Sequence, residues 1–217
     1  MSTPRHDIYA FIHKGLRAFM AHTLVRVGRL DAHDAAEVAE VSQELHALLS
    51  ICRGHVQHEN EVIHPAMQAR APGSCAQVAG EHEHHLQSLD ALAALLARVP
   101  GDPSAVHALY HALSQFVAEN FEHMQREETE HNAVLWATHG DDEIRALEHR
   151  IVSGLSPEEA QLSMRWMLPH MTPDERAAML GGMRAHAPAE AFEGVLSLIR
   201  PLLGGRDWRK LAVALGL

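Results

Sequence analysis

Two thirteen-residue segments, HVQHENEVIHPAM at residues 55–67 and HMQREETEHNAVL at residues 123–135, share the pattern His-x-Gln-x-Glu. On an α-helix, residues four apart leave the same face one turn from each other, so each copy places an imidazole beside a carboxylate. Two such faces inside a helical bundle would bring two imidazoles and two carboxylates together. This donor set indicates a buried metal site.

Context separates these two copies from three other His-x3-Glu pairs in the chain. Each of those three meets a predicted helix start or a helix breaker: His33/Glu37, His139/Glu143 and His186/Glu190. By contrast, His55/Glu59 and His123/Glu127 lie within long, uninterrupted helical patterns. The chemistry is therefore expected at these two pairs.

Four long helices are predicted to position the pairs. The 217-residue chain is 47% hydrophobic and 5% aromatic and has almost no strand-forming runs, which indicates an all-α fold. Helical periodicity and Gly or Pro breakers predict helices over residues 4–28, 34–70, 75–98 and 103–138. We expect Ser2 or Thr3 to cap the first, with Pro4 in its first turn, and a bend or fraying of the second at Pro65. Short connections favour an up-down-up-down four-helix bundle over residues 1–140.

Shorter helices with explicit start signals follow residue 140. Ser156 with Glu159, and Thr172 with Glu175, form predicted capping boxes, each with Pro at the first helical position. Further helices are expected from Pro188 and after Gly204-Gly205. We predict a boundary within residues 141–155 and a small helical C-terminal subdomain over residues 155–217. Its predicted core, or alternatively an adaptable partner-binding surface, contains Trp166, Trp208, Met164, Met167, Met171, Met179 and Met183.

The helical phase places a histidine on the apolar face of each bundle helix. His55 and His123, each with its glutamate, continue the apolar stripes of the second and fourth helices, and His13 and His82 do the same on the first and third. Burial of such groups is costly unless something compensates it. Four histidines and two glutamates are too many for one tetrahedral zinc ion. They suit two octahedral first-row ions bridged by the carboxylates, with iron or manganese favoured.

The order His13, His55/Glu59, His82, His123/Glu127, over about residues 5–138, resembles the hemerythrin-like (HHE) family. The resemblance implies a four-helix bundle that holds two non-haem iron ions. It also implies His13, His55, His82 and His123 as terminal ligands and Glu59 and Glu127 as bridges. Open coordination positions would admit O2, NO or peroxide. The C-terminal helices have no part in the resemblance.

The third helix departs from the pattern of the oxygen-carrying hemerythrins, which have His-x3-His there, because Leu86 stands four residues after His82. The form without that second histidine resembles the family's iron- and oxygen-responsive regulators and its iron–sulfur repair proteins. Alternatively, Glu81 and His85 are the third-helix pair and His82 lies outside the site. Four residues could replace the missing ligand: His85, His58, Glu61 and His131.

We expect a non-haem di-iron protein that binds O2 or a related small oxidant as a sensor or scavenger, with manganese or zinc as alternative metals. Two other functions stay open. One is an enzyme that degrades peroxide or NO at the same centre, and the other is a metal-stabilised interaction module that recruits a partner, or a second copy, through residues 155–217.

Net charge and cysteine content indicate which partners and which cellular compartment to expect. The net charge of −10 argues against nucleic acid or an anionic membrane as partner. The lack of an apolar signal segment predicts a cytoplasmic protein. Two cysteines are too few for a disulfide framework, and Cys52 is expected to be a buried, inert thiol.

Overall fold

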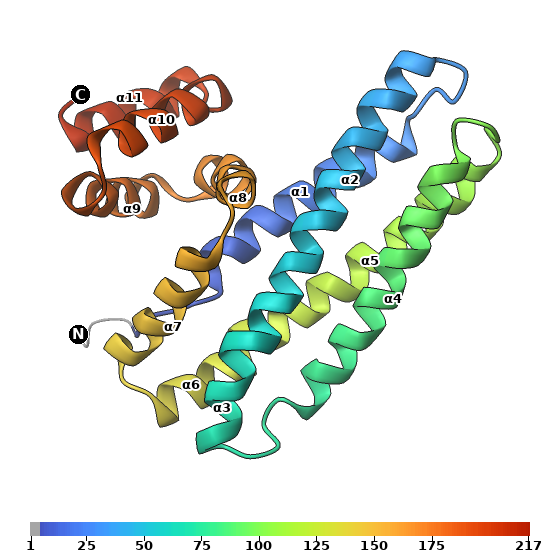
Figure 1. Cartoon of the computed structure of the whole chain (residues 1–217). Coiled ribbons are helices and arrows are strands. Elements are labelled where there is room, and N and C mark those ends of the chain that lie inside the picture. The colour runs from blue at the N-terminus through green and yellow to red at the C-terminus, as the bar shows by residue number, and fades with distance from the viewer. Residues whose placement is uncertain (1–4) are drawn as a thin grey trace. The chain divides into compact units, whose positions relative to one another are not determined.

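The computed structural model describes residues 5–217, and every regular element within that range is helical (Figure 1). The all-α prediction is therefore confirmed. The chain forms two compact units. Residues up to Ala10 together with Phe19–Leu155 make up the first, and Phe11–Ala18 together with Ser156–Leu217 make up the second. No described helix is both long enough and apolar enough to span a membrane.

The first unit contains the predicted helical bundle. After α1 (Ala10–Gly28), the chain continues through α2 (Ala35–His58), α4 (Ala76–Arg98) and α5 (Ala105–Arg126), which alternate in direction in Figure 1. The Asp34 side chain caps α2 by accepting hydrogen bonds from two backbone N–H groups. Residues three or four apart bury one face of each helix, for example Val41, Leu45, Leu48 and Cys52 on α2, Leu89, Leu92 and Leu96 on α4, and Leu109, Leu113 and Phe116 on α5.

The first helix begins later than predicted. The described residues before Ala10 are not helical, and the Asp7 side chain accepts hydrogen bonds from the backbone N–H groups of Tyr9 and Ala10, both at 3.0 Å. These bonds satisfy two backbone donors at the start of α1, so the helix begins after Asp7 rather than at Pro4. The predicted caps Ser2 and Thr3, and Pro4, lie outside the described residues.

Two predicted long helices each contain a π-helical turn. The second continues from α2 through η1 (Glu59–Ile63) into α3 (His64–Arg70), and the fourth from α5 through η2 (Glu127–His131) into α6 (Asn132–Thr138). Pro65, in the first turn of α3, has no N–H for the carbonyl of Glu61 four residues earlier. Arg150 Nη2 donates to that carbonyl at 3.0 Å. A guanidinium from a later helix thus supplies the hydrogen bond that Pro65 cannot make.

Helix α7 (Asp141–Gly154) fills most of the segment in which we expected a boundary, and it belongs to the first unit. Ile144 is fully buried in a cluster with Met67 and Leu135. The Arg70 guanidinium donates to both carboxylate oxygens of Glu143 and to the carbonyl of Thr138. The ends of α3, α6 and α7 are therefore joined by apolar and ionic contacts.

The second unit contains α8 (Pro157–His170), α9 (Pro173–His186), α10 (Ala189–Ile199), the short 3₁₀ turn η3 (Arg200–Leu202) and α11 (Gly205–Leu215). Both predicted capping boxes are confirmed. Ser156 accepts from the N–H of Glu159 while Glu159 accepts from that of Ser156, and Thr172 and Glu175 do the same. The starts of α8 and α9 are thus fixed by four local hydrogen bonds.

The second unit has its own apolar core. Met171 is buried, and Met164, Met167, Met179, Met183 and Trp208 pack against the core, as predicted, while Trp166 stacks on His170 at 5.8 Å between ring centroids. The buried members are Leu168, Met171, Leu180, Phe192, Leu196, Ile199, Leu203 and Leu211.

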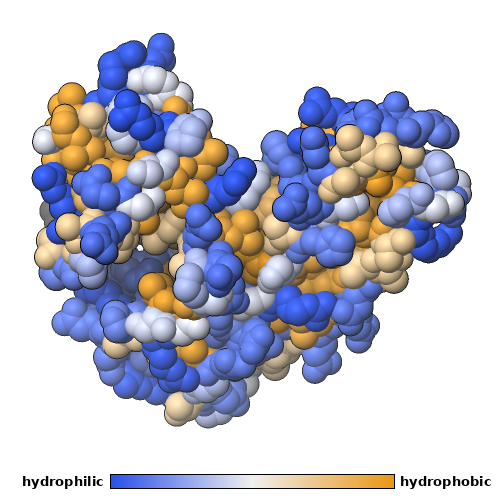
Figure 2. Space-filling view, turned by 45° about the horizontal axis from the view of Figure 1, so that its top comes forward, coloured by the Kyte–Doolittle hydropathy of each residue, from blue (hydrophilic) through white to orange (hydrophobic). Residues whose placement is uncertain are grey.

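On the face of the molecule drawn in Figure 2, most surface side chains are hydrophilic, and hydrophobic side chains form smaller patches between them.

Candidate metal centre

Each repeated segment places its glutamate at the first residue of a π-helical turn. Glu59 opens η1 and Glu127 opens η2, and their exposed fractions are 1% and 0%. A π turn widens the helix locally and is frequent at functional sites. The two carboxylates therefore occupy equivalent positions in the two halves of the sequence repeat, and both are buried in the bundle.

Glu59, His82, His123 and Glu127 form one buried group of metal-ligating side chains. One ligand atom from each lies within 4.8 Å of the others. His82 Nε2 is 3.2 Å from Glu59 Oε2 and 3.6 Å from Glu127 Oε1. His123 Nε2 lies 3.3 Å from Glu127 Oε1. Two imidazoles and two carboxylates from the four elements η1, α4, α5 and η2 thus surround one small volume.

His55 joins the same two glutamates from the other side of Glu59. Its Nε2 is 3.3 Å from Glu59 Oε1, the oxygen that does not face His82. Ligand atoms of His55, Glu59 and Glu127 also lie within 4.8 Å of one another. Because Glu59 and Glu127 belong to both groups, the geometry provides two adjacent donor sets with shared carboxylates, which suit metal binding.

Outer hydrogen bonds orient the two central histidines. His82 Nδ1 is 2.8 Å from Asn60 Oδ1, and His123 Nδ1 is 2.8 Å from Glu81 Oε2. Both Nδ1–H groups donate away from the donor group, so both Nε2 atoms face the carboxylates. Metal-ligating histidines are commonly held in this way, with a hydrogen bond from the ring nitrogen that does not bind the metal. The two Nε2 atoms are 3.2 Å apart. Two lone pairs at this distance repel unless a cation or a proton lies between them, so this donor set fits a metal ion.

The glutamates also control protonation at this position. Burial lowers the pKa of His82, but the carboxylates of Glu127 and Glu59 outweigh burial and raise it to about 9. The same balance, with Glu127 as the main partner, raises the pKa of His123 against the effect of burial. Without a metal, the two carboxylates therefore hold a proton on His82. A bound cation would take the place of that proton.

The alternative third-helix pair is placed differently. Glu81 accepts from His123 Nδ1 and forms an ion pair with Arg126, whose Nε lies 3.2 Å from Glu81 Oε1. His85 is buried with its ring 4.7 Å from that of His123, and burial followed by the neighbouring His123 lowers its pKa to about 4. Neither belongs to a donor group found among residues 5–217. His58 is half-buried and outside those groups, and exposed Glu61 accepts from Gln57.

A pocket of about 410 Å³ between α4 and α5 connects this region with solvent. His85 and His123 line it, as do Glu81 and Arg126, which form their ion pair there. The other lining residues are polar or small: Gln77, Gly80, His84, Glu119 and Glu122. The pocket therefore reaches the His123 side of the candidate centre.

His13 lies on α1, where its side chain is fully buried. It falls in the segment Phe11–Ala18, which belongs to the second unit. Its burial agrees with the expected role of His13 as a ligand, which stays a prediction.

His64 and Cys75 are missing from the predicted site, and His131 is predicted only as a substitute ligand. These three are buried and form another group whose ligand atoms lie within 4.8 Å of one another. His64 follows Glu59 by five residues and His131 follows Glu127 by four. The spacing of four is the signal that indicates His131 as a substitute ligand, and His64 has no equivalent signal. Cys75 gives none, because it stands in a connection before α4.

Fold and site together define a class: a helical bundle with a buried His/Glu cluster suited to binding metal ions. The family description "Hemerythrin HHE cation binding domain" matches residues 6–135. The chain therefore belongs to the hemerythrin HHE cation-binding family, and the predicted resemblance is confirmed. Comparisons with curated proteins and with solved structures gave no match.

Proposed function

We propose that this chain is a non-haem di-iron protein that binds O2 or a related small oxidant and serves as a sensor or scavenger. The carrying observation is that Glu59 and Glu127 are shared between two adjacent donor groups. Carboxylates that face two positions at once suit a pair of first-row ions better than a single ion. Iron fits the mixed imidazole and carboxylate set, and manganese and zinc are the alternatives.

Each predicted ligand has a role in this proposal. Glu59 and Glu127 would be shared by the two ions. His82 and His123 would hold one ion and His55 the other, and we assign the buried His13 to the second ion because the sequence pattern predicts it as a ligand. The ions would supply binding and redox chemistry toward a small oxidant.

The protein's own side chains orient the centre and control access to it. Asn60 and Glu81 hold the rings of His82 and His123. Burial of the glutamates keeps bulk water out of the donor groups, and the pocket beside Glu81 and Arg126 gives a small molecule a route inward. This route lies on the side of His82 and His123, so we expect the oxidant to bind at their ion.

Elemental analysis and paired anaerobic and aerobic absorption spectra test this function. We expect about two iron ions per chain and, on exposure to air, a charge-transfer band of a bridged di-iron centre. His82→Ala should lose iron and the band, whereas His84→Ala, an exposed neighbour on the same helix, should keep both. A folded wild-type protein that takes up no metal and gains no stability from Fe(II) would contradict the proposal.

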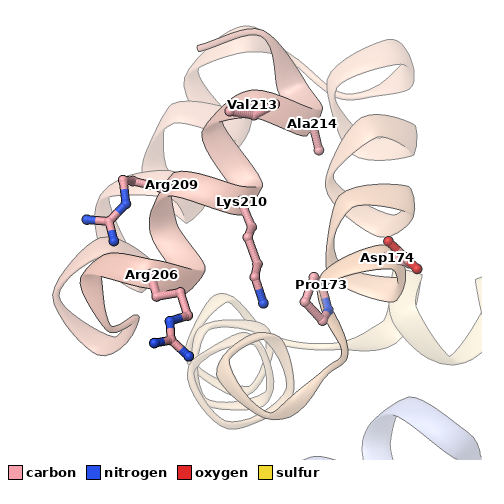
Figure 3. Close-up of a pocket in the computed structure, with 7 residues that line it drawn as sticks. All are labelled: Pro173, Asp174, Arg206, Arg209, Lys210, Val213 and Ala214. Carbon is pink, nitrogen blue, oxygen red and sulfur yellow. The ribbon is translucent and has the colours of Figure 1, made fainter.

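A second candidate function, partner recruitment, is favoured by an open groove of the second unit, between the start of α9 and α11 (Figure 3). The basic residues Arg206, Arg209 and Lys210 line it, and Lys210 extends toward Pro173. Val213 lies along the same groove and is 83% exposed. We propose that it holds an acidic peptide segment with an apolar side chain, because the lining combines clustered cations with an exposed apolar residue.

A labelled peptide of alternating Glu and Leu probes this groove. Fluorescence anisotropy should show salt-sensitive binding that the double change Arg206→Glu and Arg209→Glu abolishes. Arg165→Glu on α8, which does not line the groove, should leave binding unchanged. Equal binding by the double variant, no binding by the wild type, or occupation of the groove by a second copy of the chain would overturn the assignment.

A further inference from the structure

A second cluster of donors lies at the end of the bundle that holds the π turns. His64 is the first residue of α3, Cys75 immediately precedes α4, and His131 is the last residue of η2. Their exposed fractions are 8%, 5% and 2%. One ligand atom from each lies within 4.8 Å of the other two. Three chain segments thus bring two imidazoles and a thiol together in a place closed to solvent.

Both imidazoles carry a ring nitrogen that no protein group satisfies. Nε2 of His64 and Nε2 of His131 are buried and have no hydrogen-bond partner. A buried polar atom without a partner is destabilising, so each such atom requires an explanation. The opposite nitrogen of His131, Nδ1, is 3.4 Å from the Tyr9 hydroxyl. A histidine that binds a metal through Nε2 has the same arrangement: Nδ1 has a hydrogen-bond partner and Nε2 has none within the protein.

The thiol has only weak contacts of its own. Cys75 Sγ is 3.8 Å from the carbonyl oxygen of His64 and 3.8 Å from Ser74 Oγ. Neither contact fixes the sulfur as a short hydrogen bond would. Ligands of one tetrahedral zinc ion stand roughly 3.5 Å apart, given metal–ligand bonds of about 2.0–2.3 Å. Small side-chain rotations would bring atoms within 4.8 Å of one another to that spacing.

We propose that His64, Cys75 and His131 form a separate site for a thiophilic d¹⁰ ion, with Zn²⁺ as the expected occupant. The site has two imidazoles and one thiolate and no carboxylate, so it selects softer ions than the His/Glu centre does. On binding, the Cys75 thiol loses its proton to water and the sulfur–metal bond forms without any change in oxidation state. The ion would tie α3 to the start of α4 and to η2.

This site adjoins the proposed di-iron centre but shares no ligand with it. The His64 ring stacks on that of His82, with centroids 5.0 Å apart and planes 8° from parallel. The His131 ring meets that of His64 edge-on at 5.4 Å. Occupation would therefore hold the ring against which His82 packs. The proposal stands on its own donors and does not depend on iron in the neighbouring centre.

Cobalt substitution tests the site through its sulfur ligand. Co²⁺ added to the full chain should produce a thiolate-to-cobalt charge-transfer absorption in the near ultraviolet, which His/Glu ligands cannot produce. Cys75→Ser should lose this band. Cys52→Ser is the matched control, because Cys52 is the other buried free thiol and belongs to no donor group among the described residues. His64→Ala and His131→Ala should each lose or shift the band.

A second measurement covers the case in which Cys75→Ser does not fold. Wild-type protein loaded with Zn²⁺ should resist alkylation of Cys75, identified by peptide mass spectrometry, at least about tenfold better than metal-free protein. The absence of a sulfur band in cobalt-loaded wild type, a band that persists in Cys75→Ser, or equal alkylation with and without Zn²⁺ would each overturn the proposal. The iron spectrum reports separately on the di-iron centre, so the two claims can fail independently.

Discussion

The two units bury polar side chains for different reasons. In the second unit, buried Arg176 donates to the carbonyls of Leu168, Pro169 and Met171 and so closes the end of α8. In the first unit, His82 and His123 point their Nε2 atoms at each other and at carboxylates. The first arrangement satisfies three backbone carbonyls within the protein, although Arg176 Nη1 itself has no partner, whereas the second arrangement is suited to a bound cation. Burial alone therefore does not mark a site, whereas the direction of donors and acceptors does.

The largest effect is expected from a shared glutamate. Glu59→Ala removes a ligand from both proposed ions at once, so iron per chain should fall from about two toward zero. Glu61→Ala lies in the same π turn but carries an exposed side chain, and it should keep the wild-type iron content. Elemental analysis after loading measures both. Retention of one tightly bound ion in Glu59→Ala would show that the carboxylate is not shared.

Arg176→Met tests the structural role of the buried arginine in the second unit. Three carbonyls lose a charged donor, so the free energy of unfolding should fall by about 2–4 kcal/mol. Chemical denaturation measures this change. Because Arg176 has a structural role, iron uptake by the folded variant should equal that of wild type. A stability loss below about 0.5 kcal/mol, or a loss of iron without a loss of stability, would contradict a purely structural role for Arg176.

The pH dependence of stability should differ between the metal-free and metal-loaded proteins. The folded pKa of His82, about 9, exceeds the ordinary value of 6.5, so its ion pair is fully present below about pH 6.5 and is lost as pH rises through 9. Between about pH 7 and pH 9 the metal-free protein should lose about 2–3 kcal/mol of unfolding free energy. The metal-loaded protein should lose much less, because the cation replaces the proton. Chemical denaturation at a series of pH values measures both, and an equal fall in unfolding free energy with and without metal would contradict this prediction.

The smallest effect is expected from the outer hydrogen bonds. Glu81→Gln removes a charge from the group that orients His123 through Nδ1, so metal affinity should weaken by about 10–100-fold while the ligands stay in place. Competition with a chelator measures the change. Glu83→Gln, two residues away and exposed, is the control. Affinity unchanged in Glu81→Gln would mean that packing alone orients His123.

Helical phase is enough to predict most of the candidate site. The stripes that carry His55, His82 and His123 also carry the buried leucines of the same helices, so periodicity alone directs these histidines into the bundle. Phase cannot choose between His82 and the Glu81/His85 pair, because both lie near the same face. The geometry separates them through contacts from other helices, which periodicity does not encode.

The π turns and the His64–Cys75–His131 cluster are beyond the reach of the sequence pattern. Periodicity assumes 3.6 residues per turn, and a π turn shifts the phase of everything after it, so His64 could not be assigned a face and His131 could be predicted only as a substitute ligand. Cys75 precedes a helix, where no period applies. The predicted start of α1 was wrong for a related reason: Asp7 competes for the backbone donors, and a prediction based on Pro4 overlooked it.

Mössbauer spectroscopy of the iron-loaded protein tests most directly whether Glu59 and Glu127 join two ions into one centre. After exposure to air, we predict the spectrum of a spin-coupled ferric pair that accounts for the bound iron, at about two ions per chain. A spectrum of isolated high-spin ions, with about one iron per chain, would contradict the shared-carboxylate arrangement even if the protein bound that iron tightly.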